Sequence, residues 1–253
     1  MKSTALNPLR IRAGSVLAWL ALIAAVSGLF AAAAAGPGYR LSLWSVRAGI
    51  AAMQWAGTAA VAGATLGLLA SLVLLGTPAP RARRAAAFAF VAGLALAAPL
   101  LWLSYSAQRL PRIHDISTEP DNPLPFVAVL PLRQGARNSV QPEPATAAAQ
   151  KKGYPDIAPL MLPLPAAQAF ERAERAALAM GWTLVAVQRQ EMRIEATATT
   201  RLFGFKDDVV IRVTPQGEGA SRVDMRSLSR IGTSDMGTNA QRIRDYFARL
   251  AAG

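Results

Sequence analysis

Three long apolar runs fill the first part of the chain, over residues 13–37, 48–80 and 85–108, and none contains a charged side chain. A helix needs about 20 residues to cross the hydrocarbon core of a bilayer, so each run is long enough to span it. The pattern predicts an α-helical membrane region of three transmembrane helices within residues 1–108.

The second run contains small residues that would permit close contact with a neighbouring helix. They are Gly49, Gly57, Gly63 and Gly67. An Ala- and Gly-rich composition explains the same residues equally well, so the pattern leaves helix contact and composition as alternatives.

Beyond Pro165 the hydrophobic pattern becomes that of a folded domain, over residues 165–253. A helical stripe begins at Pro165. Alternating apolar and polar positions then predict four strands, at residues 182–188, 192–199, 209–213 and from 223 onward. A last amphipathic helix is capped by Thr233 or Ser234. This order predicts a C-terminal α+β domain with an antiparallel sheet of about four strands and helices on one face.

Residues 109–164 connect the two regions and are rich in proline, with eleven prolines between positions 111 and 165. Proline fixes φ and removes a hydrogen-bond donor, so the segment is expected to be extended or looped. We expect it to act as a linker and spacer, with residues 134–153 its most mobile part.

The chain has no Asp or Glu before Asp115, and all fifteen acidic residues lie from there onward. An unpaired carboxylate in hydrocarbon is costly, which agrees with a membrane-embedded first half. The net charge of +12 arises mostly in that half, whose eight basic residues flank the apolar runs. The second half is nearly balanced, so the charge indicates the lipid bilayer as a partner and no nucleic acid.

The basic residues also predict the orientation, because cytoplasmic loops are enriched in Lys and Arg. One side carries Lys2, Arg10, Arg12, Arg81, Arg83 and Arg84. The opposite side carries Arg40, Arg47, Arg109 and Arg112. The excess predicts a multi-pass protein of the bacterial inner membrane, with a cytoplasmic N-terminus and a periplasmic C-terminal domain. A cleaved signal peptide is the alternative for the first run, and it would leave the domain on the same side.

Missing residue types limit the chemistry. The chain has no cysteine, which excludes disulfides, thiolate metal sites and cysteine nucleophiles. His114 is its only histidine, so a multi-histidine metal site or a Ser-His-Asp relay has a single candidate. No phosphate-binding loop, dinucleotide fingerprint or G-x-S-x-G motif occurs. The sequence therefore predicts no cofactor and no metal, and favours a protein without catalytic activity.

Several spaced segments of the second half match a known pattern. They are HDISTEPDNP at residues 114–123, IEA at 194–196, FKDDVVIRV at 205–213 and VDMRSLSRIGTSDMGTNAQRI at 223–243. Together they resemble the uncharacterised family called domain of unknown function 1499, over about residues 112–250. Glu119 and Leu124 depart from the family pattern, in which Asp and a second Pro are usual. The resemblance implies no established activity and no catalytic residue.

The most site-like residues run from the end of a strand through a glycine-containing loop into the last helix. They are Arg226, Ser227, Ser229, Arg230, Ser234, Asp235, Asn239 and Arg242. Free backbone N–H groups at a helix N-terminus, with arginines beside them, can bind a phosphate or a carboxylate. Helix capping and surface ion pairs explain the same residues, and that simpler explanation is favoured.

Two further sets are candidates. Glu195, Arg212 and Asp224 would share the outward face of the sheet with Arg226 if their strands are neighbours. Cross-strand ion pairs are the expected explanation, and a groove for a polar ligand is the alternative.

The other set surrounds His114 and contains Asp115, Glu119 and Asp121. Carboxylates with a histidine can hold a cation or act as a general base. The four residues lack an established ligand spacing, so turn formation before Pro123 is favoured.

These features leave three hypotheses for function. The first is a membrane-anchored envelope protein whose periplasmic domain binds a ligand or a partner without catalysis. The second is a hydrolase acting on an envelope lipid or glycan, with Ser227, Ser229 or Ser234 as nucleophile and His114 or an aspartate as base. The third is a structural subunit that assembles through its spans with another membrane protein or as a homo-oligomer.

Overall fold

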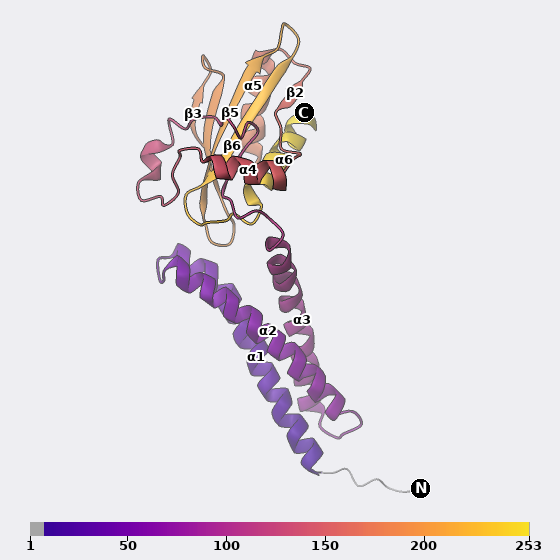
Figure 1. Cartoon of the computed structure of the whole chain (residues 1–253). Helices are drawn as coiled ribbons and strands as arrows, with labels where there is room; N and C mark the ends of the chain where they lie inside the picture. The colour runs from indigo at the N-terminus through magenta and orange to yellow at the C-terminus, as the bar shows by residue number, and fades with distance from the viewer. Residues whose placement is uncertain (1–7, 253) are drawn as a thin grey trace. The chain divides into compact units, whose positions relative to one another are not determined.

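In the computed structural model, which describes residues 8–252, the chain folds as two compact units with their boundary between Ser106 and Ala107. The first unit consists of three long helices (Figure 1): α1 (Pro8–Arg40), α2 (Val46–Val73) and α3 (Pro80–Ala107). Each is long and apolar enough to cross a membrane, which confirms the prediction of three such helices. Lys2, counted among the flanking bases, lies outside the described residues.

Glycines let the helices of the first unit approach one another closely. A Cβ added at Gly63 on α2 would lie 2.9 Å from the Cβ of Ala25 on α1. A Cβ added at Gly67 would lie 2.6 Å from the backbone nitrogen of Phe90 on α3. Such contacts are open only to glycine, so at these two positions the glycines serve helix packing within the unit.

The second unit is built on a six-stranded antiparallel sheet. Its strands are β1 (Asp115–Ser117), β2 (Leu160–Leu162), β3 (Thr183–Gln188), β4 (Arg193–Thr199), β5 (Lys206–Pro215) and β6 (Ser221–Ser229). The order is β1-β6-β5-β4-β3, and β2 also pairs with β6. The two short strands share one edge of β6, where β1 pairs with residues 226–228 and β2 with residues 221–223. The four predicted strands are present, and these two edge strands are additional.

Two helices pack on one face of this sheet, as predicted. The helices of the unit are α4 (Pro144–Gly153), α5 (Ala166–Ala179) and α6 (Thr238–Ala252), with a 3₁₀ helix η1 (Leu130–Arg133). Phe170 of α5 and Ile243 of α6 are buried in the main core with Ile194, Ile211 and Met225 of the sheet. These strand residues alternate with residues of the opposite face, which is why one face of each strand forms this core.

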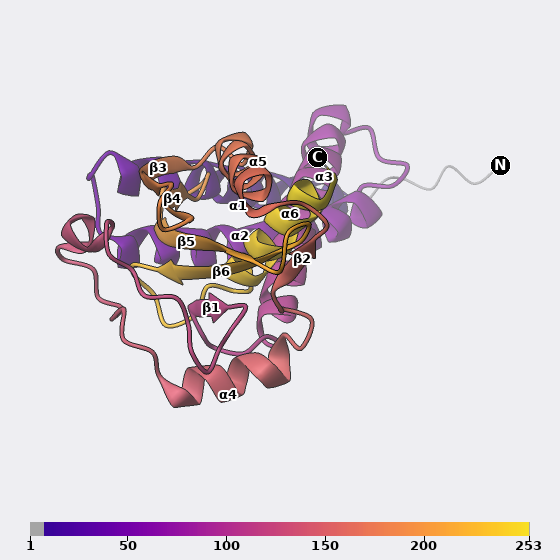
Figure 2. The same ribbon diagram turned by 90° about the horizontal axis from the view of Figure 1, so that it is seen from above.

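The opposite face of the sheet is covered by the long chain segment between β1 and β2. Figure 2 shows α5 and α6 on one side of the strands and the chain between β1 and α4 passing the other side. Leu124, Phe126 and Val129 of this segment are buried against Val210 and Leu228 of the sheet. We call residues 118–143 the cover segment.

The prediction that residues 109–164 form a separate spacer is therefore wrong. They belong to the second compact unit and supply β1, β2, η1 and α4. The high proline content does keep much of the segment irregular. Irregular chain can still pack when distant side chains satisfy its backbone groups, and the sequence does not show those distant partners.

Candidate functional site

Alternation along β6 sends the residues of the predicted anion site to opposite faces of the sheet. Arg226 and Arg230 bond to the cover segment, whereas Ser227 and Ser229 bond to Asn239 of α6. Successive side chains of a strand point in opposite directions, so the separation follows from the strand itself. The eight residues are not gathered into a single site.

On the α6 side, polar side chains form a buried network. Ser227 Oγ donates to Asn239 Oδ1 at 2.7 Å, and Arg242 Nη1 donates to Ser227 Oγ at 2.9 Å. Arg242 Nη2 donates to Asp207 Oδ2 at 2.5 Å, and Asn239 Nδ2 donates to Ser229 Oγ at 3.0 Å. The network joins α6 to β5 and β6, and it engages both serine hydroxyls.

On the other face, Arg226 is buried and bonded to the protein itself. Its Nε and Nη2 donate to the two carboxylate oxygens of Asp115 at 2.9 and 2.7 Å. Its Nη1 donates to the carbonyl oxygen of Leu124 at 2.9 Å, and its guanidinium lies 5.0 Å from the ring centroid of Phe126. Arg226 therefore holds β1 and the cover segment on the sheet.

Arg230 contributes to a second buried cluster. Asp208 is fully buried and accepts from Arg230 Nε at 2.9 Å and from Arg133 Nη1 at 2.6 Å. Thr197 Oγ1 also donates to Asp208 at 2.9 Å. Two guanidinium groups share one carboxylate, so the cluster carries a net positive charge.

Asp235, and not Ser234, caps α6. Its Oδ1 accepts from the backbone N–H of Gly237 at 2.9 Å, and its Oδ2 accepts from that of Asn239 at 2.8 Å. Ser234 Oγ accepts only from the N–H of Met236, before the helix begins. Burial raises the pKa of the Asp235 carboxyl, and the two N–H bonds act against that rise. The predicted cap at Thr233 or Ser234 is wrong, and the Asp235 carboxylate occupies the position where an anion would meet the helix N-terminus.

The predicted outward polar face of the sheet is largely covered. Glu195 is fully buried and accepts from the backbone N–H groups of Val127 and Val129, both at 3.0 Å. Arg193 Nε donates to the same carboxylate at 2.9 Å. The cover segment therefore takes the place of solvent or of a polar ligand on this face.

Asp224 and Arg212 lie opposite each other on β6 and β5. Asp224 is buried and accepts from Thr118 Oγ1 at 3.3 Å and from Arg222 Nε at 3.0 Å. Arg212 is exposed. Of the residues predicted on this face, the structure thus leaves Arg212 facing solvent and buries the acids.

The acidic residues near His114 pair with basic residues instead of gathering around the imidazole. Asp115, Glu119 and Asp121 pair with Arg226, Arg222 and Lys151, respectively. Among residues 8–252, no group of three or more His, Asp or Glu side chains is placed to hold a metal ion. His114 Nδ1 is buried and has no hydrogen-bond partner among these residues.

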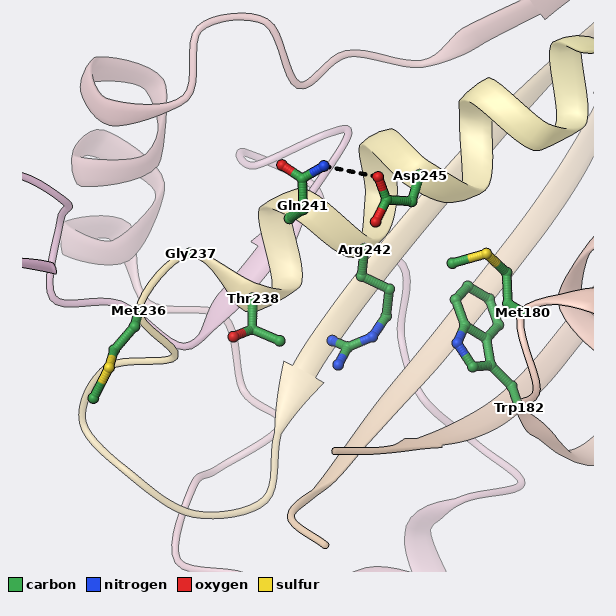
Figure 3. Close-up of a pocket in the computed structure, with 8 residues that line it drawn as sticks. All are labelled: Met180, Trp182, Met236, Gly237, Thr238, Gln241, Arg242 and Asp245. Carbon is green, nitrogen blue, oxygen red and sulfur yellow. Dashed lines mark hydrogen bonds between the residues drawn. The ribbon is translucent and has the colours of Figure 1, made fainter. Parts of the chain in front are cut away.

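A surface hollow of about 400 Å³ lies beside the first turns of α6 (Figure 3). It is lined by Met180, Trp182, Met236, Gly237, Thr238, Gln241, Arg242 and Asp245. In Figure 3, Met180 and Trp182 lie on one side of Arg242, and Thr238 and Met236 lie on the other. We call this the Trp182 hollow.

Some side chains of the Trp182 hollow contact their neighbours. The Trp182 indole stacks on the Tyr246 ring, with centroids 5.2 Å apart and planes at 26°. Tyr246 in turn donates to the carbonyl oxygen of Ala173 at 3.0 Å. Gln241 Nε2 donates to Asp245 at 2.7 Å. Trp182 and Arg242 are therefore the buried residues of the lining, whereas Met236, Gln241 and Asp245 are exposed.

Comparison with known families identifies the family of the second unit. A family model described as Protein of unknown function (DUF1499) matches residues 115–250, more than half of the chain. The chain belongs to this family. The match begins at the first residue of β1 and ends in α6, so the DUF1499 region contains the whole sheet, the cover segment and the Trp182 hollow. No curated protein matches the chain.

Sequence reasoning named one residue of the Trp182 hollow, Arg242, and missed the rest. Within the DUF1499 region, Trp182 follows Gly181, whose φ of +74° ends α5. Trp182 is only 7% exposed and belongs to the main core, so its place in the sequence indicates a core residue and gives no sign of a surface hollow. Its partners Gln241 and Asp245 come much later in the chain, so no local pattern links them to it.

Proposed function

We propose that the chain is a bacterial inner-membrane protein that holds its DUF1499 domain in the periplasm, where the domain binds a small ligand without catalysing a reaction. The Trp182 hollow is the observation that carries this proposal. Ligand sites are usually concave and mostly apolar, with a few polar groups and volumes of roughly 300–1,000 Å³. The hollow lies in this range of volume, is open to solvent and combines apolar with polar side chains.

The lining indicates what kind of ligand would fit. On one side, half-buried Met180 and the small exposed part of Trp182, 7% of its surface, offer apolar contact. Thr238, Gln241 and Asp245 offer a hydroxyl, an amide and a carboxylate on the helix. A small molecule with an apolar part and a polar part of low net charge matches this combination.

The buried network supports binding over hydrolysis. A serine nucleophile needs a general base within about 2.6–3.2 Å of its hydroxyl. Ser227 and Ser229 are buried, and their hydroxyls are bonded to Asn239 and Arg242. Ser234 Oγ accepts only from the N–H of Met236, and His114 Nδ1 has no hydrogen-bond partner among the described residues.

The charges at the helix ends support the orientation. Arg10 Nε donates to the carbonyl oxygen of Val73 at 2.7 Å and joins the start of α1 to the end of α2. Arg12 and the three arginines in the first turns of α3 belong to this same end, whereas Arg40 and Arg47 flank the α1–α2 turn at the other. By the enrichment of cytoplasmic loops in basic residues, the end with Arg10 faces the cytoplasm.

The ligand proposal is tested by filling the hollow. Gln241→Trp places a large side chain in it, and Gln216→Trp adds the same side chain at the exposed β5–β6 turn as the matched control. The full chain is purified from bacterial membranes in mild detergent, and its bound small molecules are extracted and measured by mass spectrometry. We expect a compound that co-purifies with the wild type and with Q216W, depleted at least about tenfold in Q241W, which corresponds to a loss of about 1.4 kcal/mol. Equal yields of every compound from all three proteins would contradict the proposal.

A further inference from the structure

Four segments of the second unit meet at one end of the sheet. They are residues 108–114, 130–139, 200–206 and 230–237. Pairing around β6 brings them together: the N–H of Ser229 donates to the carbonyl oxygen of His114, and that of Arg230 donates to the carbonyl oxygen of Lys206, both at 3.0 Å. The N–H of Arg137 donates to the carbonyl oxygen of Arg230, also at 3.0 Å. We call this the tether end, because the chain enters the unit there from α3 (Figure 1).

The tether end exposes apolar side chains from three separate loops. Leu132, Leu202 and Met236 are 50%, 47% and 56% exposed. Beside Leu202, the rings of Phe203 and Phe205 stack with centroids 5.1 Å apart at the tip of the β4–β5 hairpin. Apolar side chains that gather from several loops at one end of a domain are typical of an interaction surface.

The hairpin tip is closed by hydrogen bonds. The N–H of Thr200 donates to the carbonyl oxygen of Phe205, and the N–H of Gly204 donates to that of Thr200, both at 2.9 Å. The Thr200 hydroxyl accepts from the N–H of Phe205 at 2.9 Å. Gly204 has a φ of +70°, which favours glycine and closes the turn. Leu202 and the two rings are therefore presented in a fixed arrangement.

The exposed charge of the tether end is entirely basic. Its exposed charged residues are Arg109, Arg112, Arg137, Arg201 and Lys206. The nearby acids are committed inside the unit: Asp207 and Asp208 are buried against arginines, and Asp235 caps α6. The turns at the opposite end of the sheet carry exposed Glu191 and Glu218 together with exposed Arg189. The exposed charge is therefore mixed at that end and basic at the tether end.

The tether restricts where this end can be. Only residues 108–114 separate the end of α3 from the start of β1. Seven fully extended residues reach about 25 Å at most. The membrane surface is therefore the partner that the tether end meets at the highest effective concentration, whichever side of the membrane the domain occupies.

We propose that the tether end binds the surface of an anionic bilayer, the one in which the same chain is anchored. The basic side chains contact lipid phosphates, while Leu202 and the adjacent aromatic rings enter the boundary between headgroups and acyl chains. This combination of apolar tip and basic rim is typical of peripheral membrane contact. The proposal goes beyond ligand binding in the Trp182 hollow and does not depend on it.

A single fluorescent label tests this contact, since the wild-type chain contains no cysteine. Leu202→Cys carries an environment-sensitive nitrobenzoxadiazole label at the hairpin tip, and Glu218→Cys carries it at the opposite end as the matched control. The full chain is reconstituted into vesicles of phosphatidylcholine alone or of phosphatidylcholine with phosphatidylglycerol. Lipids with a spin label near the headgroup serve as quenchers.

We expect the label at position 202 to be quenched by the spin-labelled lipid in the anionic vesicles, and to be released by high salt. The label at position 218 stays in water under all conditions. Replacing Arg201 and Lys206 by Ala in the L202C protein lowers the ratio of docked to undocked domain by about fivefold for each residue. Far-UV circular dichroism verifies that this variant is folded.

Two results would overturn the proposal. One is a label at position 202 that remains in water in both kinds of vesicle. The other is a label shielded from water but unaffected by the lipid quencher and by lipid charge, which would indicate a protein partner at the tether end. Both results leave the Trp182 hollow untouched, so the two proposals fail independently.

Discussion

Buried ion pairs between residues that lie far apart in the sequence join the segments of the second unit. Arg226 is 1% exposed and binds both carboxylate oxygens of Asp115. Asp208 is shared by Arg133 and Arg230. Removing one partner of such a pair leaves a buried charge without compensation, which is far more costly than breaking a surface pair.

Replacing Arg226 by Met should therefore destabilise the domain strongly. We expect a loss of about 3–5 kcal/mol in the free energy of unfolding, because Asp115 loses its partner. Arg244→Met is the control: it breaks an exposed pair with Asp156, which is worth at most about 1 kcal/mol. Urea unfolding of the full chain in detergent measures both, with Trp182 fluorescence as the probe after the other four tryptophans are replaced by Phe. Similar small losses in the two variants would contradict the role given to Arg226.

Tyr154 makes the stability of the domain depend on pH in the alkaline range. Burial raises the pKa of Tyr154 to about 12; the nearby Asp235 adds to this rise and Arg244 opposes it. The Tyr154 hydroxyl has no hydrogen-bond partner among the described residues. A phenol whose pKa is raised on folding stabilises the fold below its unfolded pKa, and that contribution is lost as the pH rises through the folded pKa.

Tyr154→Phe should separate this effect from other alkaline transitions. An unfolded tyrosine titrates near pH 10, so the difference in stability between wild type and Y154F should be constant below about pH 10. Between there and the folded pKa of about 12, the wild type should lose stability relative to Y154F. Urea unfolding at a series of alkaline pH values measures the difference. A difference that does not change with pH would show that Tyr154 titrates normally.

At the scale of elements, the cover segment changes the interpretation of the polar face of the sheet. Residues 118–143 lie over a face that carries Glu195, Asp208 and Arg226. Their charged groups bond to backbone atoms of the segment and to one another. What resembles a polar binding surface in the sequence is therefore an internal contact between the sheet and its own chain.

Glu195→Gln should loosen this segment before it affects the rest of the domain. The change removes the negative charge that accepts the N–H groups of Val127 and Val129, and it leaves Arg193 buried without a countercharge. Hydrogen exchange of the Val127 and Val129 amides should then accelerate, while α5 and α6 keep their protection. Glu191→Gln, on an exposed turn, is the control and should change neither. Unchanged exchange at Val127 in E195Q would contradict the contact.

The sequence predicted some of these elements and missed the contacts of others. Strict alternation in β4, β5 and β6 predicted the strands, because one face of each packs on the helices. Alternation also placed Glu195 and Arg226 correctly on the second face. It could not show that this face is covered, because the covering residues are proline-rich and make no periodic pattern of their own. The Trp182 hollow was missed for a related reason, since its two walls come from distant elements.

As a whole molecule, the chain joins a three-helix membrane unit to a DUF1499 domain through a seven-residue tether. The glycines at positions 63 and 67 are used for contacts within the membrane unit. The domain differs in charge between its two ends, and the tether joins the basic one. These features fit an anchored binding domain, and they make the side of the membrane on which the domain lies the central question.

That question is answered most directly by labelling spheroplasts from outside. The cysteine-free chain accepts a single cysteine at exposed Glu218 in the domain, or at exposed Pro78 in the turn between α2 and α3. Spheroplasts expressing each variant are treated with a membrane-impermeant maleimide, before and after lysis. A periplasmic domain predicts labelling of E218C before lysis and of P78C only after it. The opposite pattern would contradict the orientation and, with it, the proposal of a periplasmic binding domain.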